Sequence, residues 1–551
     1  MRTWARIGGL ASLLFISILY FAVYNPLTLS NLDGPVNLNT LNSPDDPVMQ
    51  RVAPESGDTA YNHPKPVGRK LNNRKSSATS NNNSPSEDEI RRLAPWDGRV
   101  FDTHVQPDRW QGGGRRADNL IQRGPNGVGS QQRVFYDTEL HDKFKQYLEQ
   151  LGPGETDFYC PHMETLYQYV NRTKRRLLPL NDSWDRFYAS ISTCDLYRKN
   201  DDNTKQLLND MRKLPIKEAV MHTGGTQVKL ILTFENGKNA MVKPLRYGIG
   251  YQTNPNHFYF SDFERANAEV AAFHLDRLLD MRRAVPTTGR ELDLNEIRAK
   301  AEKALNKTFF YSPSKNLCFV GKCDYYCDTG FAICGRPDTV YGSVQAFLPD
   351  EDSVPRDHVR SPYRRTYSKR NQLAEWQTDN TYCAKNVLQK EPYATKSRRL
   401  PDLVDIYIFD FLMGNLDRHH YEVMDVFDNS AYPVHLDNGR GFGKSYEDDW
   451  GMDILAPLYQ CCIVRPHTVA VLLKYYGGSQ QLSTAMRQSL ASDPMAPVLT
   501  DTFFVALDRR VEIVLRKIAE CIQDHGGNPA EVIRNEWIHD DPIKDDDEDE
   551  K

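Results

Sequence analysis

Gly414-Asn-Leu-Asp-Arg-His-His-Tyr-Glu422 is a run of charged and polar side chains that directly follows the strongly apolar segment Ile406–Met413. The apolar segment predicts a helix, and the polar run predicts a loop that begins where the helix ends. A second polar run, Val434-His-Leu-Asp-Asn-Gly439, places Asp437 20 positions after Asp417. The two aspartates are therefore candidates for one site.

The segment between these aspartates is predicted to fold back on itself. Val423–Phe427 and Tyr432–Leu436 favour short strands, and Asp428-Asn-Ser430 favours the turn between them. Acids at the two ends of such an excursion can face one cleft, where burial requires a charged partner or a metal. From these residues alone three other interpretations stay open: a polar loop with a helix-capping side chain, a zinc site at His419 and His420, and a paired-carboxylate glycosidase.

A strand pair is predicted upstream of this region. Gln227–Phe234 is rich in β-forming residues, Glu235-Asn-Gly-Lys238 has the Asn-Gly of a hairpin turn, and Asn239–Lys243 is the return strand. The preceding loop, Gly224-Gly-Thr-Gln227, contains two glycines, which alone is a weak indication of a phosphate-binding loop.

Lys243, Glu269, Asp417 and Asp437 occur in the order that phosphoryl transfer requires. A kinase needs a lysine for the nucleotide phosphates, an acid that orients the lysine or a metal, an aspartate facing the attacking hydroxyl, and a second aspartate for the metal. Glu269 stands 26 positions after Lys243 on a helix predicted over Glu264–Leu279, which is the strand-lysine, helix-glutamate order of protein kinases. We therefore predict a kinase; a glycosidase would leave Lys243 unexplained.

The N-terminus predicts entry into the secretory pathway. Arg2 and Arg6 flank the apolar run Ile7–Tyr24, which is the pattern of a signal-anchor or a signal peptide. We favour a retained anchor, because the end of the apolar run before Asn25 has no small-x-small cleavage site, and a cleaved signal peptide is the alternative. In both cases the rest of the chain is lumenal or extracellular.

Composition supports this placement. Of 551 residues 39% are hydrophobic, and the polar excess gathers in a low-complexity stem that ends near Pro95. The net charge of −5 argues against a nucleic-acid partner. All ten cysteines lie between Cys160 and Cys521, which indicates a disulfide set in an oxidising compartment. Glycosylation sequons begin at Asn171, Asn181 and Asn306.

At these residues the chain resembles the "family with sequence similarity twenty" secretory-pathway kinases, relatives of four-jointed, and within them the Golgi casein kinase branch. The resemblance extends from Gly224 to Cys521, over half of the chain. It is carried by long stretches: Phe258–Arg265, Asn267–Arg277, Ala346–Asp350, Phe409–Glu422, His435–Gly443 and Leu458–Cys462.

The resemblance implies an α+β fold, an atypical two-lobed protein-kinase-like fold with a disulfide-bonded, mainly helical C-lobe and an N-terminal helical extension. It implies that Asp417 is the catalytic acid and that Glu269 and Asp437 bind the metal. The nucleotide would be held by these two acids together with Gln227, Lys243, Gln345, Ala346, Phe347, Leu348 and Glu422.

The implied cofactors are ATP with Mn²⁺, or Mg²⁺ in its place. The implied substrates are secreted or lumenal proteins carrying Ser-x-Glu or Ser-x-phosphoserine, and the implied location is the Golgi lumen, as a type II membrane protein or in processed, secreted form. A sister pseudokinase and a second copy of the chain are the candidate partners.

Two sister branches provide alternative functions. A proteoglycan xylose kinase has Ala-Lys-Ser-Phe-Gly where this chain has Gly439–Gly443, which favours the protein kinase, whereas Ile454–Gln460 is closer to the sugar kinase. A pseudokinase branch, an allosteric partner of an active sister, lacks the helix glutamate that is present here as Glu269.

The resemblance also implies the disulfides Cys318–Cys334 and Cys323–Cys327. It implies two bridges among Cys383, Cys461, Cys462 and Cys521 without fixing their pairing. Cys160 and Cys194 are the two that remain, and we infer that they pair.

The expected organisation has six parts. They are an anchor or signal peptide (1–24), a stem (25–95), an N-terminal extension (96–215), an N-lobe with a cysteine-rich insert (216–350), a C-lobe (351–535) and an acidic tail (536–551).

Overall fold

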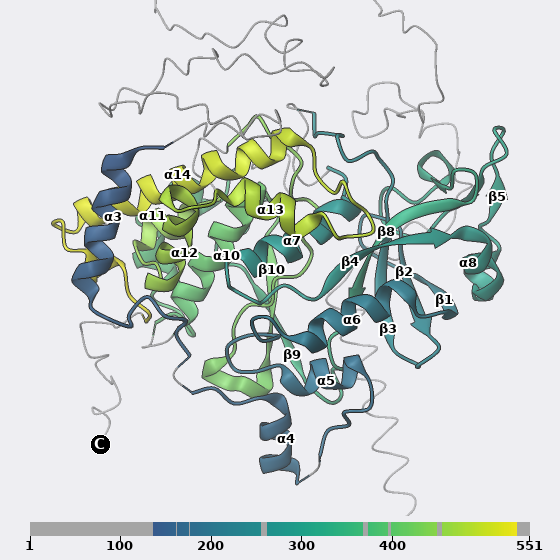
Figure 1. The fold of residues 1–551 in the computed structure, drawn as a ribbon, viewed down its shortest axis with the longest axis horizontal. Coiled ribbons are helices and arrows are strands. Elements are labelled where there is room, and N and C mark those ends of the chain that lie inside the picture. Colours follow the sequence, from purple (N-terminus) through teal and green to yellow (C-terminus); the bar gives the residue numbers. More distant parts are fainter. Residues whose placement is uncertain are drawn as a thin grey trace, which may run out of the picture. The chain divides into compact units, whose positions relative to one another are not determined.

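The computed structural model describes residues 136–536, apart from 161, 176, 255–261, 367–372, 395–397 and 449–453. Figure 1 labels the elements of this part of the chain. The predicted anchor and stem, the first 40 residues of the extension and the acidic tail beyond residue 536 lie outside it. Within the described residues no helix is long and apolar enough to cross a membrane.

An antiparallel five-stranded sheet forms the centre of the N-lobe (Figure 1). Its order is β1-β2-β3-β8-β4. The strands are β1 (Ile216–His222), β2 (Lys229–Phe234), β3 (Asn239–Pro244), β4 (Thr287–Asp293) and β8 (Thr339–Ala346).

The β2–β3 hairpin confirms the predicted strand pair. Leu230 pairs with Val242, burial alternates along both strands, and Gly237 in the turn has a φ of 78°, which glycine adopts without strain. The first strand starts at Lys229 rather than Gln227, because residues 224–228 leave the sheet to pair elsewhere.

Helix α7 (Ala266–Leu278) packs against β4 and β8, and α6 (Asp202–Lys213) contacts the same two strands. The helix predicted over Glu264–Leu279 is present, and its residues from Ala266 to Asp276 are all buried, because α7 also packs against α13 of the C-lobe.

The C-lobe is mainly helical (Figure 1). The longest helix, α14, packs against α10, α11, α12 and α13. Their bounds are α10 (Arg399–Met413), α11 (Ala456–Cys461), α12 (Pro466–Gly477), α13 (Leu482–Leu490), α14 (Asp501–Asp524) and α15 (Pro529–Val532). The lobe also contains the 3₁₀ turn Glu375–Gln377 and the π-helical turn Cys383–Val387.

The hairpin predicted over Val423–Leu436 is only partly present. Strand β10 (His420–Met424) pairs with β9 (Arg356–Arg360), which lies about 60 residues earlier in the chain. Asp425–Ser430 forms 3₁₀ turns, and only the single bridge Glu422–Val434 remains of the predicted pairing. A distant strand satisfies the backbone of β10, and local pattern cannot reveal such a partner.

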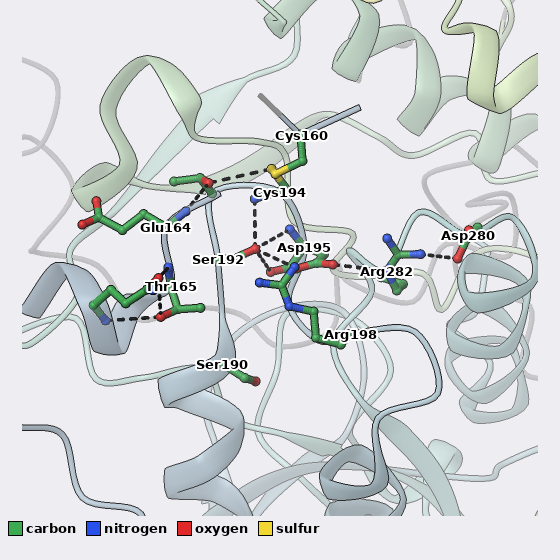
Figure 2. A network of polar contacts seen from close by, with 12 residues as sticks. Cys160, Glu164, Thr165, Ser190, Ser192, Cys194, Asp195, Arg198, Asp280 and Arg282 are labelled. Atoms are coloured by element: carbon green, nitrogen blue, oxygen red, sulfur yellow. Dashed lines mark hydrogen bonds and ion pairs between the residues drawn. A yellow bond between two sulfur atoms is a disulfide. The ribbon is translucent and has the colours of Figure 1, made fainter. Parts of the chain in front are cut away.

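The N-terminal extension consists of α3 (Thr138–Leu151), α4 (Leu166–Lys174), α5 (Ser183–Ser190) and α6. Figure 2 shows how the stretch after α5 meets the segment that follows α7. Cys194 forms a disulfide with Cys160, Asp195 accepts a hydrogen bond from Arg282 Nε at 3.2 Å, and the Leu196 N–H donates to the Arg282 carbonyl. The extension thus holds the segment that runs from α7 to β4.

The cysteine-rich insert follows β4. It contains α8 (Leu294–Lys300), α9 (Lys303–Asn306), a 3₁₀ turn (Thr329–Phe331) and a small sheet of β5 (Phe310–Tyr311), β6 (Leu317–Phe319) and β7 (Ile333–Cys334).

All ten cysteines are paired. Cys318–Cys334, Cys323–Cys327 and Cys160–Cys194 agree with the pairs expected from the sequence. The open pairing resolves as Cys383–Cys461 and Cys462–Cys521, so the adjacent Cys461 and Cys462 tie α11 to two different parts of the C-lobe.

Candidate active site

Lys243 is the centre of a cluster of carboxylates. Its Nζ lies 2.5 Å from Glu269 Oε1, 2.9 Å from Glu264 Oε2 and 3.0 Å from Asp437 Oδ1. Burial acts to lower the pKa of Lys243, but the three carboxylates outweigh it and raise the pKa well above its usual range. Lys243 is therefore a fixed cation.

The helix and loop that carry the acids hold them in place. Glu269 is in the first turn of α7, is 2% exposed, and accepts a hydrogen bond from the Asn438 N–H through its other oxygen at 3.2 Å. Lys243 is the main cause that lowers the pKa of Asp437 well below its ordinary value. Glu269 thus contacts both the lysine and the loop that contains Asp437.

Asp417 lies in a loop that is held in place by the end of helix α10 and by the side chains of its neighbours. Helix α10 ends at Gly414, whose φ of 71° reverses the chain. The Asp417 N–H donates to the Asn415 side chain at 3.0 Å. Arg418 makes a bidentate pair with Asp410, both bonds 2.8 Å, and donates to Asn438 Oδ1 at 2.8 Å. Arg418 therefore ties the Asp417 loop to the Asp437 loop.

Two basic side chains contact Asp417. Arg440 Nε lies 3.1 Å from Asp417 Oδ2, and His419 Nδ1 lies 3.4 Å from Asp417 Oδ1. The hydrogen bond to Asp417 raises the pKa of His419, against the effect of burial. The ring centroid of His420 lies 4.4 Å from that of His419 and 5.8 Å from that of His358, and burial lowers the pKa of His420.

The glycine loop pairs with the cysteine-rich insert. The Gly224 N–H donates to the Lys322 carbonyl, the Asp324 N–H donates to Gly225, and the Tyr326 N–H donates to Thr226. Gln227 is buried in this arrangement.

The remaining predicted nucleotide residues lie at the end of β8 and on β10. Gln345 donates to Thr287 at 3.0 Å, and Ala346 ends the strand that leads out of the sheet. Glu422 pairs with Arg356 at 2.9 Å instead of with a residue of the lysine cluster.

Glu264 and Arg440 are the site residues that sequence reasoning missed. Glu264 was quoted only as part of a matching stretch, yet it contacts Lys243 and accepts a hydrogen bond from Thr226 Oγ1 at 3.0 Å. The sequence placed Glu264 at the start of the predicted helix, five positions before Glu269, whereas the observed helix begins at Ala266, so Glu264 reaches Lys243 from the segment before α7.

The donor set fits a divalent cation. Three carboxylates face one lysine, and carboxylate oxygens are the ligands that Mn²⁺ and Mg²⁺ prefer. Among the described residues, no group of three Asp, Glu, His or Cys side chains is arranged so that it could hold a metal ion. The Lys243 ammonium lies between the carboxylates, so a cation would have to bind beside it and share them.

The three predicted glycosylation asparagines, Asn171, Asn181 and Asn306, are exposed. Exposure is a requirement for a glycan acceptor, and glycosylation itself stays a prediction.

Comparison with known proteins gives the class of this chain. The family model described as "Fam20C: Golgi casein kinase, C-terminal, Fam20" matches residues 182–529, and the chain belongs to the Fam20 family. It is 50% identical over 408 residues to the extracellular serine/threonine protein kinase CeFam20 of Caenorhabditis elegans, covering 74% of this chain and 77% of that one. It is 46% identical to human FAM20C, covering 62% of this chain and 58% of that one.

Solved structures agree. The crystal structure of the Golgi casein kinase matches with a TM-score of 0.70 at 48% identity, covering 74% of this chain and 95% of that one. The same kinase with Mn and ADP bound matches with a TM-score of 0.65 at 48% identity, covering 73% and 90%. The kinase-like α+β fold expected from the sequence is confirmed.

Both sister branches are more distant. The mouse pseudokinase FAM20A is 40% identical, covering 62% of this chain and 66% of that one. The zebrafish glycosaminoglycan xylosylkinase is 38% identical, covering 63% and 82%.

Proposed function

We propose that this chain is an ATP-dependent serine/threonine protein kinase of the secretory pathway that phosphorylates secreted proteins at Ser-x-Glu or Ser-x-phosphoserine. The observation that carries the proposal is the lysine cluster, in which Lys243, Glu269 and Asp437 come together from three distant segments within the fold of a casein kinase.

The proposed roles follow from what each side chain contacts. Lys243 binds the nucleotide phosphates, and Glu269 keeps it in position. Asp417 accepts the proton of the substrate hydroxyl, with its loop held by Asn415. Gln227, Gln345–Leu348 and Glu422 bind the rest of the nucleotide.

Glu269 and Asp437 would hold Mn²⁺, with Glu264 as a further ligand. When bound, the ion neutralises the charge of the phosphates. The solved relative with Mn and ADP supports this choice.

The decisive experiment offers the purified chain labelled ATP, Mn²⁺, casein and a xylose-containing tetrasaccharide. We expect label on casein. Label on the sugar alone would establish the xylose kinase, and label on neither would support the pseudokinase alternative. The greater identity to the protein kinases, 50% against 38%, favours casein.

Two substitutions separate the proposed roles. Asp437→Ala should lose binding of Mn²⁺ and nucleotide, whereas Asp417→Ala should keep nucleotide binding and lose transfer, because catalysis here consists of positioning and charge stabilisation. Full activity of Asp417→Ala would refute its role. Asp202→Ala is the matched control, since this aspartate is on the exposed surface of α6 and pairs with Lys205 of the same helix.

We also propose that residues 1–24 direct the chain into the secretory lumen, as an anchor or a cleaved signal, and that the six-part organisation given above holds. Removal of N-linked glycans from the expressed chain should shift its mass, and replacing Asn171, Asn181 and Asn306 should abolish that shift. If removing N-linked glycans did not change the mass of the wild-type chain, glycosylation would give no support to the proposed entry into the secretory pathway.

A further inference from the structure

Arg440 connects the two lobes at the point where the reaction takes place. It belongs to the C-lobe loop three positions after Asp437, and its side chain is 9% exposed. Its Nε lies 3.1 Å from Asp417, and its Nη2 donates to Thr226 Oγ1 in the glycine loop at 3.3 Å.

The backbone around Arg440 is fixed on both sides. The Gly439 carbonyl accepts from the Arg265 N–H at 2.6 Å, and the Phe442 N–H donates to the Met413 carbonyl at 2.6 Å. A Cβ on Gly439 would lie 3.0 Å from Glu264 Cβ, so a larger residue here would push against the acids of the lysine cluster. These contacts on both sides of Arg440 hold its guanidinium group in one place.

That place is between the expected donor and acceptor of the phosphoryl group. Under the proposed function, the glycine loop with Thr226 is the expected phosphate-binding loop, and Asp417 is the expected acceptor of the hydroxyl proton. An in-line transfer moves the γ-phosphoryl group from the first to the second, with charge spread over its three equatorial oxygens. The planar guanidinium fork suits such oxygens, whereas Lys243 is a point charge already held by three carboxylates.

A purely structural ion pair accounts less well for these contacts. The bond to Thr226 is long and has a neutral acceptor, so it contributes little and is readily exchanged for an anionic oxygen. The contact with Asp417, at 3.1 Å, holds the guanidinium beside the carboxylate that is expected to face the substrate hydroxyl.

We propose that Arg440 is a further catalytic residue, which binds the transferring phosphoryl group; this rests on the proposed kinase function. The serine oxygen bonds to the γ-phosphorus, the bond from that phosphorus to the β–γ bridging oxygen breaks, and the electron pair leaves with ADP. The serine proton passes to Asp417. Arg440 exchanges Thr226 for the equatorial oxygens and donates to them.

The test uses the full-length chain with Arg440→Gln and Arg440→Lys, and with Arg516→Gln as the control, because Arg516 pairs with Glu512 of α14 and Asp137 of the extension and with none of the proposed site residues among those described. Steady-state transfer to a Ser-x-Glu peptide, binding of Mn·ADP, and binding of ADP with aluminium fluoride are measured.

We expect Arg440→Gln to lower kcat about 10²–10³-fold. The KM values and the Mn·ADP affinity should stay within about threefold of wild type, and the melting temperature should stay within a few degrees. Wild type should bind ADP with aluminium fluoride more tightly than ADP alone, and Arg440→Gln should lose this difference. Arg440→Lys should recover part of kcat.

Three results would overturn the proposal: a kcat of Arg440→Gln within fivefold of wild type, a raised peptide KM with unchanged kcat, or an equal loss of Mn·ADP affinity. A wild-type chain that transfers to no peptide would instead refute the kinase function, so the two failures are distinguishable.

Discussion

Lys243 contacts three carboxylates and Lys229 lies 3.6 Å from one of them, Glu264, so two ammonium groups face three acids and the excess negative charge favours binding of a cation. Glu264 and Glu269 are 7% and 2% exposed, so neither can escape into solvent. Removing Lys243 takes away the cation shared by all three acids, while Glu264 keeps Lys229 and Glu269 keeps the Asn438 N–H, and we expect a cost on the order of 3 kcal/mol.

We predict that Lys243→Met lowers the melting temperature in EDTA and that Mn²⁺ raises it more in this variant than in wild type, because the ion replaces the missing charge. Thermal unfolding with and without Mn²⁺ measures both effects. Lys517→Met, which removes a surface pair with Glu520, is the control. Equal Mn²⁺ shifts in wild type and Lys243→Met would contradict a cation site at these carboxylates.

His274 makes the stability of the N-lobe depend on pH. It lies on α7, is 4% exposed and contacts Ser489 of α13 at 2.7 Å. Burial lowers its pKa to about 4, aided by Arg277 and Arg212 and opposed by Asp493. Between pH 6.5 and pH 4 the unfolded chain therefore binds a proton that the folded chain refuses, and stability falls as pH falls.

We predict that His274→Gln removes about 3 kcal/mol of this acid-induced loss, the value of a pKa lowered from 6.5 to about 4. Urea unfolding at pH 7.5, 6.5, 5.5 and 4.5 measures it. The free energies of wild type and variant should converge on acidification. His358→Gln, at an exposed histidine, should leave the slope unchanged. A constant difference at all four pH values would contradict the assignment.

At the scale of single residues, the sequence predicted the charged groups that phosphoryl transfer requires. Lys243, Glu269 and Asp437 were expected to act together, and the structure brings them into contact. Glu264 and Arg440 were not foreseen, because their contacts join positions that only the tertiary fold brings near each other.

Among the elements, the turn closed by Cys323–Cys327 acts on the glycine loop. Bridges Thr223–Lys322 and Gln227–Tyr326 run parallel on either side of it. Gly224 and Gly225 have φ of 102° and 74°, so this loop adopts a conformation that no regular strand would hold. The cysteine-rich insert therefore pairs with the glycine loop as a neighbouring strand would.

We predict that Cys323→Ser with Cys327→Ser raises the KM for ATP at least about tenfold. Opening so short a loop should cost only about 2 kcal/mol of stability. Steady-state kinetics and chemical unfolding separate the two effects. Removing Cys160–Cys194, which lies at the extension instead, is the control and should affect stability more than the KM. An unchanged KM for ATP would show that the loop holds its shape without the disulfide.

Hairpins and helices with local signals were predictable, and elements with distant partners were not. The Asn-Gly turn fixed β2 and β3, whose register needs no other information. Strand β10 pairs with β9, which lies about 60 residues earlier in the chain, and α7 packs against α13. The strand pairing of β10 and the burial of α7 therefore depend on tertiary contacts that local sequence does not reveal.

For the whole molecule, the expected α+β fold was correct because the order of strand pair, helix and polar loop restricts the topology. The buried ionic connections between segments could not be predicted. Asp402 is fully buried and contacts Arg283 at 2.6 Å, Arg465 at 2.7 Å and Arg398 at 3.2 Å. Although burial opposes it, these guanidinium groups hold the pKa of Asp402 well below its ordinary range.

Asp402 joins three parts of the molecule. Arg283 follows α7 and leads into β4, Arg398 precedes α10, and Arg465 precedes α12. Asp402→Asn keeps the shape of the side chain and removes the carboxylate charge that Arg283 and Arg398 contact, whereas Arg465 keeps its pair with Asp405 at 2.5 Å. We predict a loss of about 3–5 kcal/mol in the free energy of unfolding.

Denaturant unfolding of four chains measures it: wild type, Asp402→Asn, Arg283→Met and the double variant. Arg283→Met in the Asp402→Asn background should recover part of the loss, because it removes one uncompensated charge. Asp202→Asn, at an exposed aspartate, should leave the midpoint unchanged. Strictly additive losses would contradict the coupling of Arg283 to Asp402, and a stable Asp402→Asn chain would show that the arginines are satisfied by their carbonyl and aspartate neighbours instead.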